Sequence, residues 1–244
     1  MNLPLPDIYL LVASSFIGSV LTAALGVGGG AFLITMMAGV VPPLALIPLH
    51  GVVQMGSNAS RALHSRKHLN ISRFGYFMAG ALVASLATFW LIGQIDVDLI
   101  PLMVAVFVLW LVWAPMPDFK LGTSPAGLLS GGILTTLASM LVGASGPLVS
   151  AWLGRTGHDK WQYTALFSTC MTAQHLLKII VFGFAGFVFS EWLGLLALML
   201  LAAYLGTRVG LKMLGKLPEA QFKTLFRWML TLLSIRLIWQ WYGL

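Results

Sequence analysis

Apolar stretches long enough to cross a lipid bilayer follow one another along almost the whole chain. Of its 244 residues, 59% are hydrophobic and only 9% are charged, whereas an ordinary soluble domain carries about a quarter charged residues. The short segments of alternating polarity that are typical of membrane β-barrels are absent from the sequence. We therefore predict an all-α polytopic membrane protein with about eight transmembrane helices, within a range of roughly seven to ten segments.

The formal net charge of +7 comes from short runs of Lys and Arg between apolar segments, and such runs set membrane topology. The predicted partners are the lipid bilayer and a small anion but not nucleic acid, and self-association into a homo-oligomer is left open. Cys170 is the single cysteine, so the chain has no internal disulfide framework and no cysteine-rich metal site. The histidines lack metal-ligand spacing with carboxylates, and no catalytic set stands out. We expect no enzymatic activity, no cofactor and no metal.

A glycine-rich interruption lies inside the first apolar region, in the sequence LGVGGGAFLI. Glycine costs about 1 kcal/mol relative to alanine in a helix interior, so this cluster predicts a broken or re-entrant helix. A second interruption, GASGP, lies in the other half of the chain. The candidate binding residues in them are Gly26, Gly28, Gly29 and Gly30 in the first, and Gly143, Ser145 and Gly146 in the second.

The chain divides into two corresponding halves, residues 1–118 and 119–244. An offset of 117 residues separates Gly26 from Gly143 and also separates Arg61 from Lys178. After the first interruption we expect an apolar segment over residues 31–48 and then a more polar helix over residues 49–63. The two halves correspond as two pseudo-symmetric repeats.

Loop charges bear on the orientation of these repeats. Basic residues follow the polar helix in the first half but come one segment later in the second half. If basic loops stay in the cytoplasm, equivalent loops lie on opposite sides of the membrane, as inverted repeats require. A parallel repeat of four plus four helices remains the alternative.

The paired interruptions have two interpretations. Small residues let membrane helices approach closely, and residues 26–30 fit the GxxxG pattern of such packing. Alternatively, a helix that restarts inside the membrane exposes N–H groups that bind anions, and glycine lets a ligand approach the backbone. Because paired interruptions are the best sequence indication of a transporter's midplane site, we favour a binding site.

Polar side chains precede two cations within the apolar regions. Gln54, Asn58 and Arg61 share one face of a helix, and so do Gln174 and Lys178. Intramembrane cations are costly and usually functional, although a long side chain near a helix end can reach the interface instead. That alternative applies most to Arg61, which adjoins a basic loop.

No Asp or Glu lies well inside an apolar segment, so a site in these segments favours anions. His50 and His175 are the candidates for proton coupling, with a hydrogen-bonded structural histidine as the alternative for each. The predicted substrate-binding residues are Gly26, Gly28, Gly29, Gly30, Gln54, Asn58, Arg61, Gly143, Ser145, Gly146, Gln174 and Lys178.

Three stretches together resemble the TauE/SafE family of membrane permeases, the sulfite exporters: LGVGGGAFLITMMAGVVPPLALIPLHG, GASGPLV and TAQHLLKIIVFGFAG. The resemblance covers nearly the whole chain. It implies a multi-pass transporter of the bacterial cytoplasmic (inner) membrane that exports sulfur-containing anions such as sulfite or organosulfonates. The chain departs from the family pattern at Pro42, Pro43, Pro48 and His50, and its second interruption has fewer glycines.

We expect alternating access around an anion site between the two repeats. An anion channel or an uptake permease for another small anion is the first alternative, because no residue indicates the direction of transport. A membrane anchor or assembly protein that transports nothing is the second.

Overall fold

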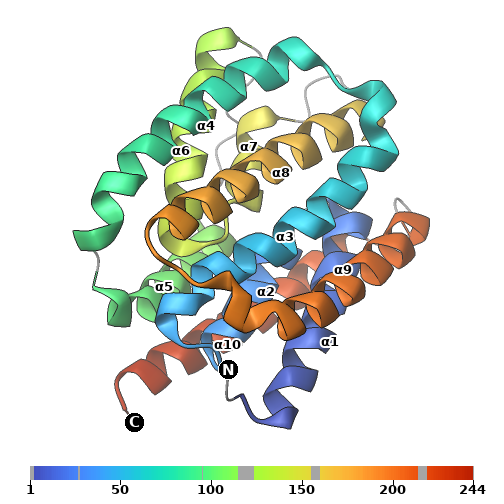
Figure 1. Cartoon of the computed structure of the whole chain (residues 1–244). Coiled ribbons are helices and arrows are strands. Elements are labelled where there is room, and N and C mark those ends of the chain that lie inside the picture. Colours follow the sequence, from blue (N-terminus) through green and yellow to red (C-terminus); the bar gives the residue numbers. More distant parts are fainter. Residues whose placement is uncertain are drawn as a thin grey trace.

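The computed structural model of the chain describes residues 3–26, 28–94, 96–114, 124–154, 160–213 and 219–243. Within these ranges the regular secondary structure is entirely helical (Figure 1). The first half contains α1 (Leu5–Leu25), α2 (Gly29–Ala38), α3 (Pro43–Ser65), α4 (Ile71–Leu91) and α5 (Ile100–Trp113). The second half contains α6 (Pro125–Val142), α7 (Gly146–Leu153), α8 (Lys160–Phe184), α9 (Leu193–Met213) and α10 (Glu219–Trp241). Single-turn 3₁₀ helices are η1 (Arg66–His68), η2 (Ile92–Gln94), η3 (Val97–Leu99) and η5 (Phe189–Trp192).

Five segments of the described chain are long and apolar enough to cross a membrane: α1, α4, α6, α8 and the run of η5 with α9. The protein is therefore an all-α membrane protein. The expected number of about eight spans is not confirmed by these criteria of length and composition. The other long helix of the first half, α3, carries too many polar groups, and α5 is only 14 residues long.

Both predicted interruptions break a helix. α1 ends at Leu25, and Gly26 and Gly28 adopt φ angles of 91° and 104° before α2 begins. α6 ends at Val142, and Gly143 adopts a φ angle of 80° before α7 begins. Side chains rarely tolerate these left-handed conformations, whereas glycine adopts them without steric cost.

Each broken helix folds back on the helix before it. The start of α2 lies so close to α1 that a Cβ atom on Gly29 would stand 1.7 Å from the carbonyl oxygen of Gly18. In the second half, the indole N–H of Trp152 in α7 donates to the carbonyl oxygen of Gly127 near the start of α6. Thus α1 with α2, and α6 with α7, form two helical hairpins.

The expected apolar segment over residues 31–48 is wrong in its boundaries. α2 already ends at Ala38, and α3 begins at Pro43 and runs unbroken past Pro48 to include the whole polar stretch. Pro42 is the N-cap, and Pro43 occupies the first helical position, where the missing N–H breaks no hydrogen bond. The two prolines therefore start a helix that the hydrophobic pattern alone places later.

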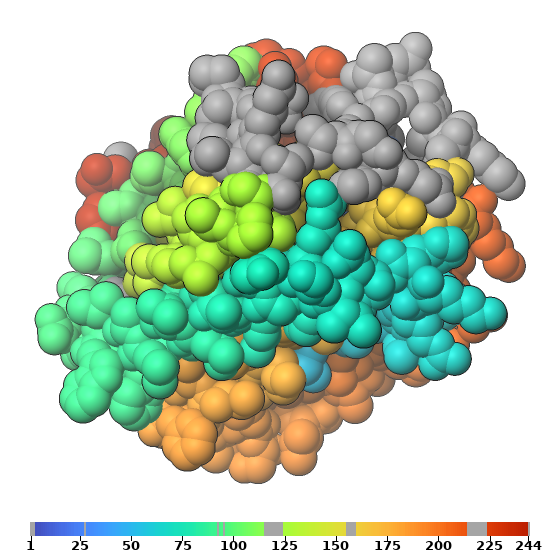
Figure 2. All heavy atoms as spheres, turned by 90° about the horizontal axis from the view of Figure 1, so that it is seen from above, coloured from blue at the N-terminus to red at the C-terminus, as the bar shows by residue number. Residues whose placement is uncertain are grey.

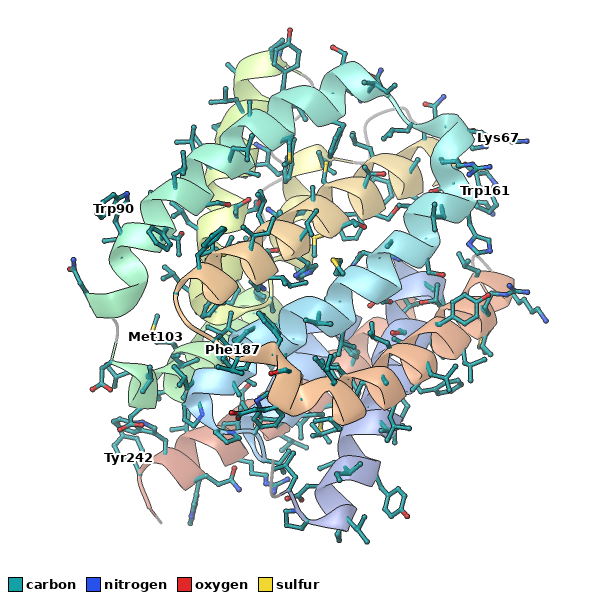
Figure 3. The ribbon with its side chains drawn as sticks, viewed as in Figure 1. Lys67, Trp90, Met103, Trp161, Phe187 and Tyr242 are labelled. Carbon is teal, nitrogen blue, oxygen red and sulfur yellow. The ribbon has the colours of Figure 1, made fainter. Side chains whose placement is uncertain are left out.

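The long helices pack in pairs that join the two halves. α1 packs on α9, α4 packs on α6, α3 lies beside α8, and α5 packs on α10. Figure 2 shows α4 beside α6 on one face of the molecule. Large apolar side chains such as Trp90, which is 77% exposed, project outward as expected for a surface that faces lipid (Figure 3).

Candidate functional site

A small cavity lies between the two helix breaks. The centre of a water-sized sphere can occupy a volume of about 20 Å³ in this cavity. One water needs roughly 10–15 Å³ by the same measure, so the cavity holds about one water. Residues from α1, both breaks, α2, α3, α7 and α8 surround it. Among the described residues that line it, none is Asp or Glu. The breaks of the two halves therefore meet at one compact site.

The N-termini of α2 and α7 begin at this cavity. Their first intrahelical bonds run from Phe32 N to Gly28 O, at 3.0 Å, and from Val149 N to Ser145 O, at 2.9 Å. The N–H groups before these positions have no intrahelical acceptor, and neither N-cap residue provides a side-chain cap. Two helix ends with partial positive charge are thus directed at one site.

α3 provides a polar wall of the cavity. His50, Gln54 and Asn58 line it at intervals of four residues, which places them on one face of the helix. Asn58 Nδ2 donates to Gln54 O at 2.7 Å, so the carboxamide is held by its own helix. Gln54 lies opposite Gly30, whose added Cβ would stand 3.4 Å from the carboxamide.

α8 provides the opposite wall, which is mostly apolar. Phe167, Met171 and His175 line the cavity, again at intervals of four residues. An added Cβ on Gly146 would meet Phe167 at 3.9 Å and Met171 at 4.0 Å. The phenyl ring and the methyl end of Met171 therefore lie beside the start of α7 and leave room for about one methyl group.

Arg61 does not line the cavity but caps the end of α1. The side chain is only 2% exposed, so it does not reach the membrane interface. Its Nη1 donates to the carbonyl oxygens of Thr22, at 3.2 Å, and Gly26, at 3.5 Å, and its Nη2 donates to Asn58 Oδ1. The guanidinium also lies 5.3 Å from the ring centre of Phe167. The cation thus binds the free carbonyl oxygen of Gly26 and a second carbonyl oxygen, that of Thr22, which also accepts the backbone N–H of Gly26.

Lys178 has the equivalent place at the other break. The side chain is fully buried, and Nζ donates to the carbonyl oxygen of Gly143 at 3.0 Å. Gly51 makes room for it, because a Cβ there would stand 2.9 Å from Lys178 Cδ. Both cations therefore lie next to the breaks but outside the cavity lining, and each donates to a carbonyl oxygen at the C-terminal end of an interrupted helix.

The two predicted histidines face each other in the cavity. Their ring centres lie 5.8 Å apart, with an angle of 78° between the ring planes. His50 Nε2 lies 3.0 Å from the carbonyl oxygen of Gly30. His50 Nδ1 and both ring nitrogens of His175 are buried and have no hydrogen-bond partner among the described residues. Only His50 resembles the hydrogen-bonded structural histidine considered above.

The model of the TauE/SafE sulfite exporter family matches residues 10–237. The chain belongs to this family. No curated protein and no solved structure matches it. Members of the TauE/SafE family are membrane transporters rather than enzymes, and the apolar helices agree with a multi-pass membrane protein.

This TauE/SafE protein brings together most of the residues that its sequence singles out. Those that line the cavity are Gly28, Gly30, His50, Gln54, Asn58, Gly143, Ser145, Gly146 and His175. Gly26 in the first break and Gly29 at the start of α2 are not among the lining residues. Gln174 also lies outside the lining and joins the second break to α6, because its Nε2 donates to Thr135 and Thr136 and its Oε1 accepts from Ser145 at 3.0 Å.

Phe167 and Met171 are lining residues that the sequence analysis missed, together with Thr22, Ala31 and Ala144. Pro147, the last residue of the second interruption, lines the cavity as well. A signal for Phe167 and Met171 was present. The offset of 117 residues that relates Arg61 to Lys178 also relates His50 to Phe167 and Gln54 to Met171. The offset thus identifies equivalent cavity positions even where the residue types differ.

Proposed function

We propose that the protein exports sulfite, or a sulfur oxyanion of similar size, from a bacterial cell by binding it in the cavity between the two helix breaks. One observation carries the proposal: two helix N-termini without side-chain caps begin at the same cavity. Each end attracts negative charge through its free N–H groups. Two buried cations stand behind the breaks, and no carboxylate lies among the described lining residues to oppose them.

The unlike walls favour an anion with unlike faces. Sulfite is a pyramid with three oxygens on one side and a sulfur lone pair on the other. Its oxygens suit the side chains of α3 and the helix N–H groups, and its sulfur suits Phe167 and Met171 on α8. Sulfate would place a fourth oxygen against these apolar groups, and an unpaired buried oxygen costs about 1–3 kcal/mol.

The two cations act on the anion without contacting it in this arrangement. Arg61 and Lys178 are bound to carbonyls of the broken helices, so their hydrogen bonds hold the breaks in place. Their charge still contributes positive potential across the cavity, because charges interact over several ångströms in an interior of low dielectric constant. Removal of either cation therefore affects both the structure of a break and the affinity for anions.

Two inverted repeats, residues 1–118 and 119–244, are the arrangement that we propose for the transporter. If the halves are equivalent, α1 corresponds to α6 and α4 corresponds to α9. The packing of α1 on α9 then has its counterpart in the packing of α6 on α4, which is also present. The pairs α3 with α8 and α5 with α10 map onto themselves. A two-fold relation between the halves accounts for all four long contacts.

The positions of the helix ends support inversion rather than a parallel repeat. His68, after the end of α3, stacks on Trp161 at the start of α8, so these helices run in opposite directions. Lys67 and Trp161 lie together at one edge of the molecule, away from Trp90 and Tyr242 (Figure 3). We propose that each hairpin begins and ends on one side of the membrane and that the three helices after it, α3–α5 and α8–α10, cross it, which gives the odd number of crossings that inversion needs.

Alternating access then requires the walls to separate. The cavity has room for little more than one water, so an anion of four heavy atoms enters only when a hairpin moves relative to α3 and α8. The basic segments near η1 would face the cytoplasm, as the distribution of loop cations favours.

The proposal is tested by measuring sulfite efflux from proteoliposomes that contain a variant with one extra methyl group in the cavity. Gly30→Ala places a Cβ at van der Waals distance from Gln54 and requires no change of backbone conformation. The methyl fills the site, so we expect efflux to fall to the level of empty liposomes. The matched control is Gly75→Ala in α4, whose Cβ meets nothing within 4 Å.

The outcomes separate the alternatives. If Gly30→Ala is folded and transports at the wild-type rate, the cavity is not the path. Accumulation of sulfite against its gradient excludes a passive channel, and absence of any flux from the wild type supports an anchor or assembly protein.

A further inference from the structure

A pair of imidazoles stands inside the anion cavity with most of its hydrogen-bonding capacity unused. His50 and His175 come from facing helices, are fully buried, and lie 5.8 Å apart between ring centres. Three of their four ring nitrogens have no partner within the described chain. Buried polar atoms normally have partners, so these nitrogens indicate a ligand that is bound during the working cycle.

Two basic side chains lie near the imidazole pair, and His50, His175 and Lys178 are the titratable groups that adjoin the cavity. Lys178 on α8 and Arg61 on α3 are the charged side chains nearby, and both are bound to backbone carbonyls. α2, α6 and α7 contain no titratable residue, and the single acidic residue of α1 is Asp7 in its first turn. No carboxylate in these helices takes the place of the anion as a counter-charge.

We propose that His50 and His175 bind a proton together with the anion, so that transport is coupled to protons. The proposal rests on the function proposed above. An anion that enters the cavity favours a proton on the pair, because the opposite charges attract strongly in a site of low dielectric constant. By linkage, a bound proton strengthens anion binding by the same factor.

The proton balance of the cycle is simple. On the side where the anion enters, a free ring nitrogen of the pair takes a proton from water, and an N–H bond forms that can donate to an anion oxygen. On the other side, the anion leaves and the proton returns to water from the same nitrogen. No other covalent bond is made or broken, and each anion moves with one proton.

Calorimetry of sulfite binding tests this coupling. Titrations in two buffers with different ionisation enthalpies measure the protons taken up per sulfite bound. Sulfite itself takes up or releases protons near neutral pH, and this contribution to the measured proton uptake is the same for every variant. The wild type is therefore compared with His175→Gln and with His50→Gln. We expect the wild type to take up roughly one more proton per sulfite than either variant at slightly alkaline pH. His68→Gln, at an exposed position in η1, is the matched control and should behave as wild type.

Each outcome decides a point. Equal proton uptake by wild type and variants that still bind sulfite overturns the coupling and leaves the anion site intact. If the variants lose binding, nitrogen-15 spectra of the wild-type histidines decide, because a doubly protonated ring on sulfite addition supports the proposal and a neutral ring overturns it. A wild type that gives no heat with sulfite overturns the proposed function and the coupling with it.

Discussion

The two walls of the cavity occupy equivalent places in the two halves of the chain but differ in chemistry. Four positions on α3 correspond to four on α8 at the offset of 117 residues. The pairs are His50 with Phe167, Gln54 with Met171, Asn58 with His175, and Arg61 with Lys178. In the first three pairs the residue on α3 and the residue on α8 differ in chemical type. In the last pair both helices carry a basic side chain.

The difference separates what the fold requires from what the ligand requires. Each half breaks a helix, and the free carbonyls at that break need a donor. Arg61 meets this need at Gly26, and Lys178 meets it at Gly143. The lining residues are not needed to satisfy the carbonyls of a break. Their chemistry can therefore differ between the walls, with amide groups on α3 and a phenyl ring and a thioether on α8.

Replacement of each cation by methionine should give the largest effects. Arg61 donates to two carbonyls and to Asn58, whereas Lys178 donates to Gly143. A buried polar group left without its partner costs about 1–3 kcal/mol. We expect Arg61→Met to lower the free energy of unfolding by about 3 kcal/mol and Lys178→Met by about 1–2 kcal/mol.

Thermal unfolding of the purified variants in detergent measures this order. Arg236→Met, at an exposed position on α10, is the control and should leave the unfolding temperature near that of wild type. Equal unfolding temperatures for Arg61→Met and wild type would show that the first break needs no cation.

Part of this arrangement follows from sequence alone. The glycines predict both breaks because a left-handed φ and a close approach of α2 to α1 exclude other residues at Gly28 and Gly29. The offset relates the breaks to each other, and paired interruptions in two halves predict one shared site. The predicted start of the polar helix at residue 49 is wrong, because Pro42 and Pro43 begin α3 although the hydrophobic pattern places them inside an apolar segment.

The contacts of the polar side chains were beyond prediction from sequence. Gln174 and His175 are neighbours in a polar stretch, yet only His175 lines the cavity, because Thr135 and Thr136 on α6 take the hydrogen bonds of Gln174. The carbonyl partners of Arg61 belong to a helix end whose direction depends on tertiary packing. Helical periodicity identifies a face but not the helix that the face meets.

Met171→Gln should have the next largest effect, because it gives α8 the side chain that α3 has at the equivalent position. The new amide can donate to a fourth oxygen, so binding of sulfate should improve relative to sulfite by roughly tenfold, which corresponds to about 1.4 kcal/mol. Competition by sulfate in a sulfite efflux assay measures the ratio. Met171→Leu keeps the wall apolar and should keep the wild-type preference; an unchanged preference in Met171→Gln would mean that α8 does not face the anion.

Ser145→Gly should have the smallest effect. It gives the second break the residue that the first break has at the equivalent position, Gly28. The variant loses the hydrogen bond from Ser145 to Gln174 but no cap of α7, so we expect a loss of about 1 kcal/mol in unfolding free energy and sulfite efflux within a few-fold of wild type. A complete loss of efflux in a folded variant would assign the hydroxyl to the anion site itself.

The most direct test of the central claim is a crystal structure with selenite, which has the shape of sulfite and a selenium atom that anomalous scattering locates. The account predicts a selenium peak between the N-termini of α2 and α7, with oxygens in hydrogen-bond range of N–H groups near Gly30 and Gly146. A cavity without selenium, or a peak bound directly to Arg61 or Lys178 outside the breaks, would contradict the claim that the paired helix ends form the anion site.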